Sequence, residues 1–100
     1  RIYPKHHQFN FGQLRDEDIS GVALMLQRVL GKIKKGLNDP AYNFYIHTAP
    51  VGDNHQHYHW HIEILPKTSV WAGFELGTGI EISSIAPEDA AKFLRSVKVK

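Results

Sequence analysis

The sequence contains no cysteine. Disulfide bonds are therefore excluded, and any metal that this chain binds must be held by histidine and carboxylate side chains. A chain without cysteine also suits a reducing compartment, so we expect a cytoplasmic location.

Long apolar runs and clustered basic charge are also missing. No stretch approaches the roughly 20 apolar residues of a membrane span, so no membrane partner is expected. The net charge is only +2, and the lysines and arginines are scattered along the chain. Without a basic stripe interleaved with aromatic residues, nucleic acid is not an expected partner either.

The chain has 100 residues, of which 42% are hydrophobic and 22% are charged. This composition is typical of a globular protein, and the length suits one domain, residues 1–100. The chain begins at Arg1, inside a segment typical of a strand and without an initiator methionine. We therefore expect it to be part of a longer chain.

The most informative stretch is residues 57–66, which read HYHWHIEILP. Apolar and polar residues alternate there, and this pattern predicts a half-buried β-strand. Neighbours on one side of a strand are roughly 6–7 Å apart, so adjacent imidazoles could approach a common metal or phosphate. Each buried polar group needs water, a partner or a ligand. The two predicted faces are Tyr58, Trp60, Ile62 and Ile64, and His57, His59, His61 and Glu63.

Two amphipathic helices are predicted. The first begins at the acidic run of residues 16–18 and stops at Asn38-Asp39-Pro40, and the second begins at Pro87. Each has apolar residues spaced three or four apart, which is typical of a core-facing stripe. The stripes are Ile19, Val22, Leu26, Val29, Leu30, Ile33 and Leu37 in the first helix, and Ala90, Phe93, Leu94 and Val97 in the second.

The remaining segments predict strands and loops. Residues 1–4 and 42–48 are expected to be strands, 50–56 a loop, 71–79 an irregular loop with three glycines, and 80–82 a short strand. Together with the two helices, these elements predict an α+β domain. Its helices should cover one face of a mainly antiparallel sheet.

The histidine stretch and the neighbouring strand suggest metal binding. A hairpin-like return would bring His47 beside the polar face, where His47, His61 and Glu63 could hold one ion. His7, in the loop after Pro4-Lys5, could join His59 instead. The spacing leaves open whether there are one or two metals, and zinc suits these ligands.

Other interpretations of the same residues remain. One imidazole could attack phosphorus while its neighbours bind phosphate, although Glu63 on that face would repel the developing charge. A metal-dependent small-molecule binding module is a third class. Glu75, flanked by Gly73 and Phe74, suits binding of sugar hydroxyls beside an aromatic wall. Its alternative is a solvated loop acid.

Six motifs in order resemble the C-terminal half of galactose-1-phosphate uridylyltransferase, in particular its bacterial and archaeal branch and the related plant ADP-glucose phosphorylase. They cover essentially all of the chain. The motifs are residues 2–7 (IYPKHH), 37–43 (LNDPAYN), 46–50 (IHTAP), 59–66 (HWHIEILP), 73–79 (GFELGTG) and 86–91 (APEDAA).

The resemblance implies a histidine-triad-like domain, the C-terminal half of a two-domain enzyme of that superfamily. Such enzymes transfer a nucleoside monophosphate between UDP-glucose and a hexose 1-phosphate, through a nucleotidyl-histidine. The nucleophile belongs to the first domain, so this chain should carry no catalytic nucleophile and should be inactive without its N-terminal half. UDP-hexose, hexose 1-phosphate and a homodimer partner are implied, in galactose and carbohydrate metabolism.

The resemblance also implies site residues. His7 and His59 match two zinc ligands, whose two cysteine partners would lie before Arg1. A second arrangement uses His47, His61 and the position of Glu63, so zinc or iron is the expected cofactor. Gly73-Phe74-Glu75 matches a segment whose carboxylate binds the hexose, often across a dimer interface. The alternative is a self-sufficient histidine triad hydrolase or transferase with His59 as nucleophile, flanked by His57 and His61.

Overall fold

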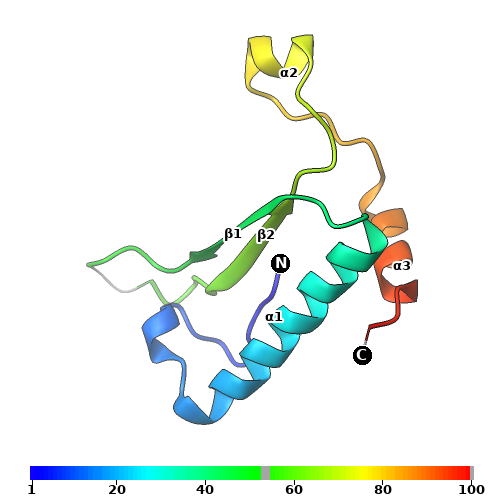
Figure 1. Ribbon diagram of the computed structural model, residues 1–100. Coiled ribbons are helices and arrows are strands. Elements are labelled where there is room, and N and C mark those ends of the chain that lie inside the picture. The colour runs from blue at the N-terminus through cyan, green and yellow to red at the C-terminus, as the bar shows by residue number, and fades with distance from the viewer. Residues whose placement is uncertain (53–54, 100) are drawn as a thin grey trace.

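The computed structural model describes residues 1–52 and 55–99; Asp53 and Asn54 of the predicted 50–56 loop lie outside them, as does Lys100. The fold is α+β, as predicted (Figure 1). Its elements are the 3₁₀ turn η1 (Phe11–Gln13), helix α1 (Asp16–Gly36), strands β1 (Tyr42–His47) and β2 (His61–Pro66), and helices α2 (Gly73–Thr78) and α3 (Pro87–Ser96).

Helix α1 confirms the predicted long helix. Its first turn carries three acidic residues and its last turn two lysines, which complements the helix dipole at both ends. The chain leaves the helix through Asn38 and Asp39, whose φ angles are 59° and 53°. Asparagine and aspartate tolerate this left-handed region better than most residues, so the sequence ends the helix where the backbone must turn.

Strands β1 and β2 form an antiparallel pair, as the predicted return required. The register places Phe44 opposite Ile64, Ile46 opposite Ile62, Tyr45 opposite Glu63 and His47 opposite His61. Because side chains alternate along each strand, this pairing separates the sheet into two faces. One face carries Phe44, Ile46, Ile62 and Ile64, and the other carries Tyr45, His47, His61 and Glu63.

Helix α1 lies across the apolar face of the sheet (Figure 1). The core beneath it is built on Trp60, which is completely buried, and on Ile2 and Ile62. The Trp60 indole Nε1 donates to Gln8 Oε1 at 3.1 Å, so its one polar atom has a partner. Partly buried side chains complete the cluster: Phe11, Leu14, Val22, Leu26, Val29 and Ile64.

The predicted strand over residues 57–66 is wrong in its first four positions, because β2 begins only at His61. The loop before η1 takes the hydrogen bonds that a longer hairpin would need: Trp60 N donates to Gln8 O and Ala49 N donates to Phe9 O. Further out, Tyr58 N donates to His55 O and closes a turn. His57 therefore lies in an exposed turn and not in the predicted row.

At the other end of the hairpin, two predictions are wrong. The predicted irregular loop contains helix α2, capped by Gly79 with φ 73°, whose N–H donates to Glu75 O. The predicted strand over residues 80–82 does not form, since Ile82 N donates to the Glu75 side chain and not to a neighbouring strand.

The strand predicted over residues 1–4 is reduced to one bridge, between Ile2 and Ile62.

Helix α3 begins at Pro87, as predicted, and packs against the C-terminal part of α1. A Cβ at Gly36 would lie 3.0 Å from Val97 and 3.2 Å from Phe93, so glycine allows the close approach. Lys32 Nζ donates to the carbonyl oxygens of Leu94, Arg95 and Val97. Among the described residues, no helix is both long and apolar enough to span a bilayer.

Candidate metal centre

The polar face of the hairpin brings His47, His61 and Glu63 together. His47 and His61 are direct partners in the β-ladder, and their ring centroids are 4.9 Å apart. Glu63 follows two residues after His61 and so projects from the same face. Its Oε2 lies 3.6 Å from His61 Nε2 and 3.9 Å from His47 Nδ1. One ligand atom from each residue lies within 4.8 Å of the other two.

This cluster is partly shielded from solvent. The side chains of His61 and Glu63 are 12% and 16% exposed, whereas His47 is 43% exposed and forms the open side. Arg1 contributes a guanidinium nitrogen 3.4 Å from Glu63 Oε1. Desolvation acts to raise the pKa of Glu63, but Arg1, then His47 and His61, outweigh it, so the pKa of Glu63 lies below its usual value. The carboxylate is held ionised, as a metal ligand must be.

The donor set fits a divalent metal. Two imidazoles and one carboxylate are common ligands of zinc and of iron, and a three-residue set leaves a position for water or substrate. Tetrahedral ligands at bond lengths near 2.0–2.1 Å are separated by about 3.3 Å. The contacts of Glu63 Oε2 with the two imidazoles, 3.6 and 3.9 Å, are only slightly wider. All three ligand atoms lie within 4.8 Å of one another, so the side chains would have to move closer together to hold one ion.

The second predicted pair, His7 and His59, also lies together, with ring centroids 5.4 Å apart. His59 Nε2 makes a hydrogen bond with Pro4 O at 2.8 Å, and His7 Nε2 contacts Gln56 O. Because a carbonyl oxygen can only accept, Nε2 is the donor nitrogen of His59, which leaves Nδ1 as the nitrogen that could bind a metal. Within the described residues this pair offers two ligands, so a closed site there needs ligands from elsewhere.

The predicted sugar-contacting residues do not join this centre. Gly73, Phe74 and Glu75 belong to α2, which stands away from the body beyond the Pro66 end of the hairpin (Figure 1). The length of β2 alone separates them from His61 by roughly 17 Å, at about 3.3 Å per residue. Phe74 is 58% exposed, and the Glu75 carboxylate accepts from Ile82 N.

Sequence reasoning missed three neighbours of the centre. The ring of Tyr45 stacks on that of His47 with centroids 4.8 Å apart, and the ring centroids of Tyr3 and His61 are 4.9 Å apart. Arg1 pairs with Glu63. The signal for Tyr45 was present, since it shares a strand face with His47. Nothing local to residues 1–3 shows that this segment reaches β2, because only long-range contacts, among them the bridge between Ile2 and Ile62, place it there.

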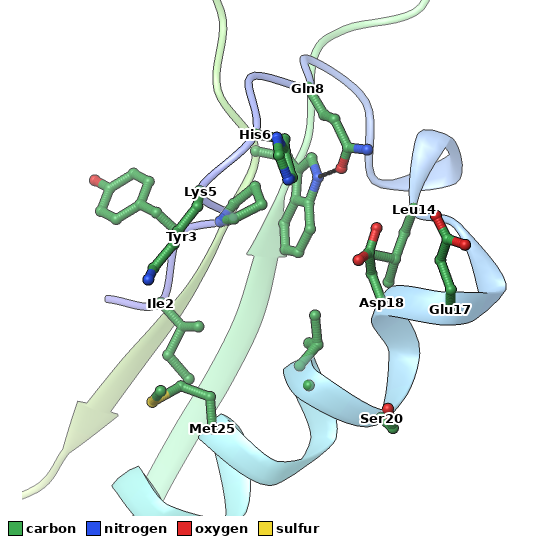
Figure 2. A pocket seen from close by; sticks show the side chains of 14 residues that line it. Ile2, Tyr3, Lys5, His6, Gln8, Leu14, Glu17, Asp18, Ser20 and Met25 are labelled. Carbon is green, nitrogen blue, oxygen red and sulfur yellow. Dashed lines mark hydrogen bonds between the residues drawn. The ribbon is translucent and has the colours of Figure 1, made fainter.

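A cavity of about 430 Å³ lies on the other side of the sheet, between the N-terminal segment and the first turns of α1 (Figure 2). Trp60, Leu14 and Met25 contribute apolar walls, and Lys5 and Asp18 are among its charged residues. None of its lining residues belongs to the His47, His61 and Glu63 cluster. The candidate metal centre is therefore a site on the strand face and not part of this cavity.

The chain is similar in sequence to known proteins. No family model matches the chain. The chain is 43% identical over 101 residues to ADP-glucose phosphorylase of Arabidopsis thaliana, covering 98% of this chain and 29% of that protein. A weaker match, 28% identical over 74 residues, is to a 16.1 kDa HIT-like protein of Mycoplasma pneumoniae, covering 73% of this chain and 50% of that protein.

Solved structures agree. The crystal structure of an ADP-glucose phosphorylase from Arabidopsis thaliana with bound ADP-glucose matches with a TM-score of 0.89 and 40% identity, over 98% of this chain and 32% of that one. A GalT-like protein from the same plant matches with a TM-score of 0.88 and 40% identity, over 98% of this chain and 34% of that one. The chain thus spans about a third of the length of these plant relatives. These relatives, 40–43% identical, are galactose-1-phosphate-uridylyltransferase-like members of the histidine triad superfamily, and the chain is similar to the C-terminal part of their longer chains.

Proposed function

We propose that this chain is the metal-holding and hexose-contacting part of an enzyme that transfers nucleoside monophosphates from sugar nucleotides. The observation that carries this proposal is the cluster of His47, His61 and Glu63 in a chain 43% identical to an ADP-glucose phosphorylase. A fixed set of two imidazoles and an ionised carboxylate has an obvious use in metal binding. A purely structural strand gains little from the same set.

Within this proposal, the chain's own residues hold the metal and do not attack phosphorus. His47 and His61 would each present one ring nitrogen, and Glu63 its Oε2, which faces both imidazoles. Zinc or iron bound there would tie β1 to β2 and offer a Lewis-acid position toward the exposed side of His47. The nucleophilic histidine would come from the N-terminal half of the longer enzyme.

Glu75 and Phe74 would contact the hexose at a different place. Because α2 lies roughly a strand length from the metal centre, these residues would serve a sugar held by another part of the enzyme, such as the partner in a homodimer. Phe74, 58% exposed, offers an aromatic wall, and the Glu75 carboxylate can accept from two sugar hydroxyls.

Two candidate reactions fit this proposal, and they differ in the nucleotide and in the acceptor. Uridylyl transfer between UDP-glucose and a hexose 1-phosphate is the reaction that the six motifs imply. Phosphorolysis of ADP-glucose is the second. It is favoured by the 43% identity to an ADP-glucose phosphorylase and by the similarity to a crystal structure of such an enzyme with bound ADP-glucose. A longer protein containing this domain, assayed with each donor and with phosphate or galactose 1-phosphate as acceptor, would distinguish them.

The metal part is tested on this chain alone. Elemental analysis and zinc titration should show saturable binding that falls at least about tenfold in His47→Ala, His61→Ala and Glu63→Gln. His57→Ala is the matched control, because it removes an exposed imidazole from the neighbouring turn. Unchanged binding in all three cluster variants would contradict the proposed centre.

The alternative with His59 as nucleophile has its own test. Incubation of the 100-residue chain with a sugar nucleotide, followed by acid-free quenching and mass spectrometry, should show no nucleotidyl adduct on any histidine. A trapped adduct on His59, or robust turnover by this chain alone, would overturn the proposed division of roles.

A further inference from the structure

The N-terminal segment pairs with β2 through one antiparallel bridge. Ile2 N donates to Ile62 O at 2.8 Å, and Ile62 N donates to Ile2 O at 2.9 Å. Alternation along this extended segment therefore continues the two faces of the sheet. Figure 2 shows Ile2 directed toward Met25 of α1 and the ring of Tyr3 directed away from it. Tyr3 thus lies on the metal-centre face.

On that face, the Tyr3 ring contacts two histidines at once. Its centroid lies 4.9 Å from that of His61 and 5.6 Å from that of His59, in an edge-on arrangement with His59. The residue after Tyr3, Pro4, accepts the His59 Nε2–H at 2.8 Å. The same short segment therefore holds His59 by a ring contact and by a backbone hydrogen bond.

His59 stays out of the cluster although it is close to His61 in the sequence. His59 and His61 are two residues apart, a spacing that on an extended chain allows both imidazoles to reach one metal. Nevertheless, the three groups that converge in the described part of the chain are His47, His61 and Glu63. His59 instead lies beside His7.

We propose that Tyr3 is a positioning residue that keeps the imidazoles of His59 and His61 in separate sites. It thereby limits the metal centre to His47, His61 and Glu63. This inference rests on the metal centre proposed above. Without the Tyr3 ring, His59 keeps its contact with His7 and its bond to Pro4, and a neutral hydrogen bond contributes about 1 kcal/mol net. A metal–imidazole bond would outcompete that restraint, so His59 would join His61.

The test is a double-mutant cycle read by cobalt binding. Four chains are titrated with Co²⁺, all with His7→Ala so that the second pair is removed: the parent, His59→Ala, Tyr3→Ala and the double variant. His59→Ala should change the affinity of the parent less than twofold. In the Tyr3→Ala background it should lower the affinity at least about tenfold, with a changed visible spectrum, because a ligand is lost.

Two control variants sharpen the cycle. Tyr3→Phe keeps the ring and should behave as the parent does. Tyr45→Ala removes the ring that stacks on His47. In that background, His59→Ala should leave the Co²⁺ affinity unchanged. If circular dichroism shows that Tyr3→Ala fails to fold, Tyr3→Leu replaces it in the cycle, because leucine keeps apolar bulk without the flat ring.

The outcomes separate the two proposals. A tenfold loss from His59→Ala in the parent, or no His59 dependence after removal of Tyr3, would overturn the role of Tyr3 and leave the metal centre in place. Absence of saturable Co²⁺ binding in the parent would overturn both. Saturable binding that depends on His59 only without Tyr3 supports both.

Discussion

The two ends of the β1–β2 hairpin differ in how firmly the chain holds its functional side chains. At the histidine end, Trp60 is completely buried and His61 is 12% exposed, with partners from β1 and from the N-terminal segment. At the other end, Leu76 of α2 is 71% exposed. The first end is a preorganised site built within one chain. The second is an exposed surface, and under the proposed function its partner groups would come from another part of the enzyme.

Replacement of each tryptophan by alanine should give the largest difference in stability loss between these two ends. Trp60→Ala removes the centre of the core and should lower the free energy of unfolding by about 3–5 kcal/mol. Trp71→Ala, on a side chain 42% exposed, should cost less than about 1 kcal/mol. Urea denaturation followed by circular dichroism measures both. Equal losses would mean that the segment around α2 is as firmly packed as the core.

Metal should stabilise the histidine end and leave the other unaffected. At a free metal concentration about 100 times the Kd, binding contributes about 2.7 kcal/mol, which corresponds to a Tm increase of roughly 10–20 °C for a domain of this size. A chelator should remove the increase. His61→Ala should abolish it, whereas Glu75→Gln should keep it in full. An increase that survives His61→Ala would place the metal elsewhere.

The same contrast explains what could be predicted from the sequence. Helix α1 and strand β1 follow periodic patterns that are satisfied locally, and each starts where predicted and ends about one residue earlier. The row from His57 to Glu63 was half right. His61 and Glu63 share a face, but the loop before η1 takes the hydrogen bonds of Trp60 and Ala49 and ends the ladder. Such long-range competition leaves no local pattern.

Around α2 the failure has a different cause. Three glycines between residues 73 and 79 predicted a loop, yet Gly79 at φ 73° is the left-handed cap that ends a short helix. The sequence did contain a signal for this helix, because Gly79 follows Phe74 and Glu75 at a distance that suits a glycine cap of a short helix. Ile80 and Ile82 alternate like a strand, but they are 59% and 56% exposed, and no strand in the described part of the chain pairs with them. Alternation predicts a strand only where a ladder partner exists.

A smaller effect is expected where α3 meets α1. Lys32 Nζ lies 2.9 Å from Leu94 O and 2.8 Å from Val97 O, so its charge satisfies carbonyls at the end of α3. Lys32→Met should cost about 1 kcal/mol, seen mainly as faster hydrogen exchange of α3 amides. Lys34→Met, at an exposed position of the same helix, is the control. Unchanged exchange in α3 would show that apolar packing alone holds it.

The smallest effects should come from a pair of glycines in α2 that act in opposite directions. Gly77 lies inside the helix, where a Cβ would meet no other group, so Gly77→Ala should favour helix by about 1 kcal/mol. Gly79 adopts φ 73°, so Gly79→Ala should cost about 1 kcal/mol and unwind α2. Backbone chemical shifts of residues 73–78 report both changes. Because α2 stands apart from the hairpin, the Tm of the core should stay the same in both variants (Figure 1). A Tm that followed the two substitutions would show that α2 and the end of the hairpin with His47, His61 and Glu63 are one cooperative unit, and not two parts joined by a linker.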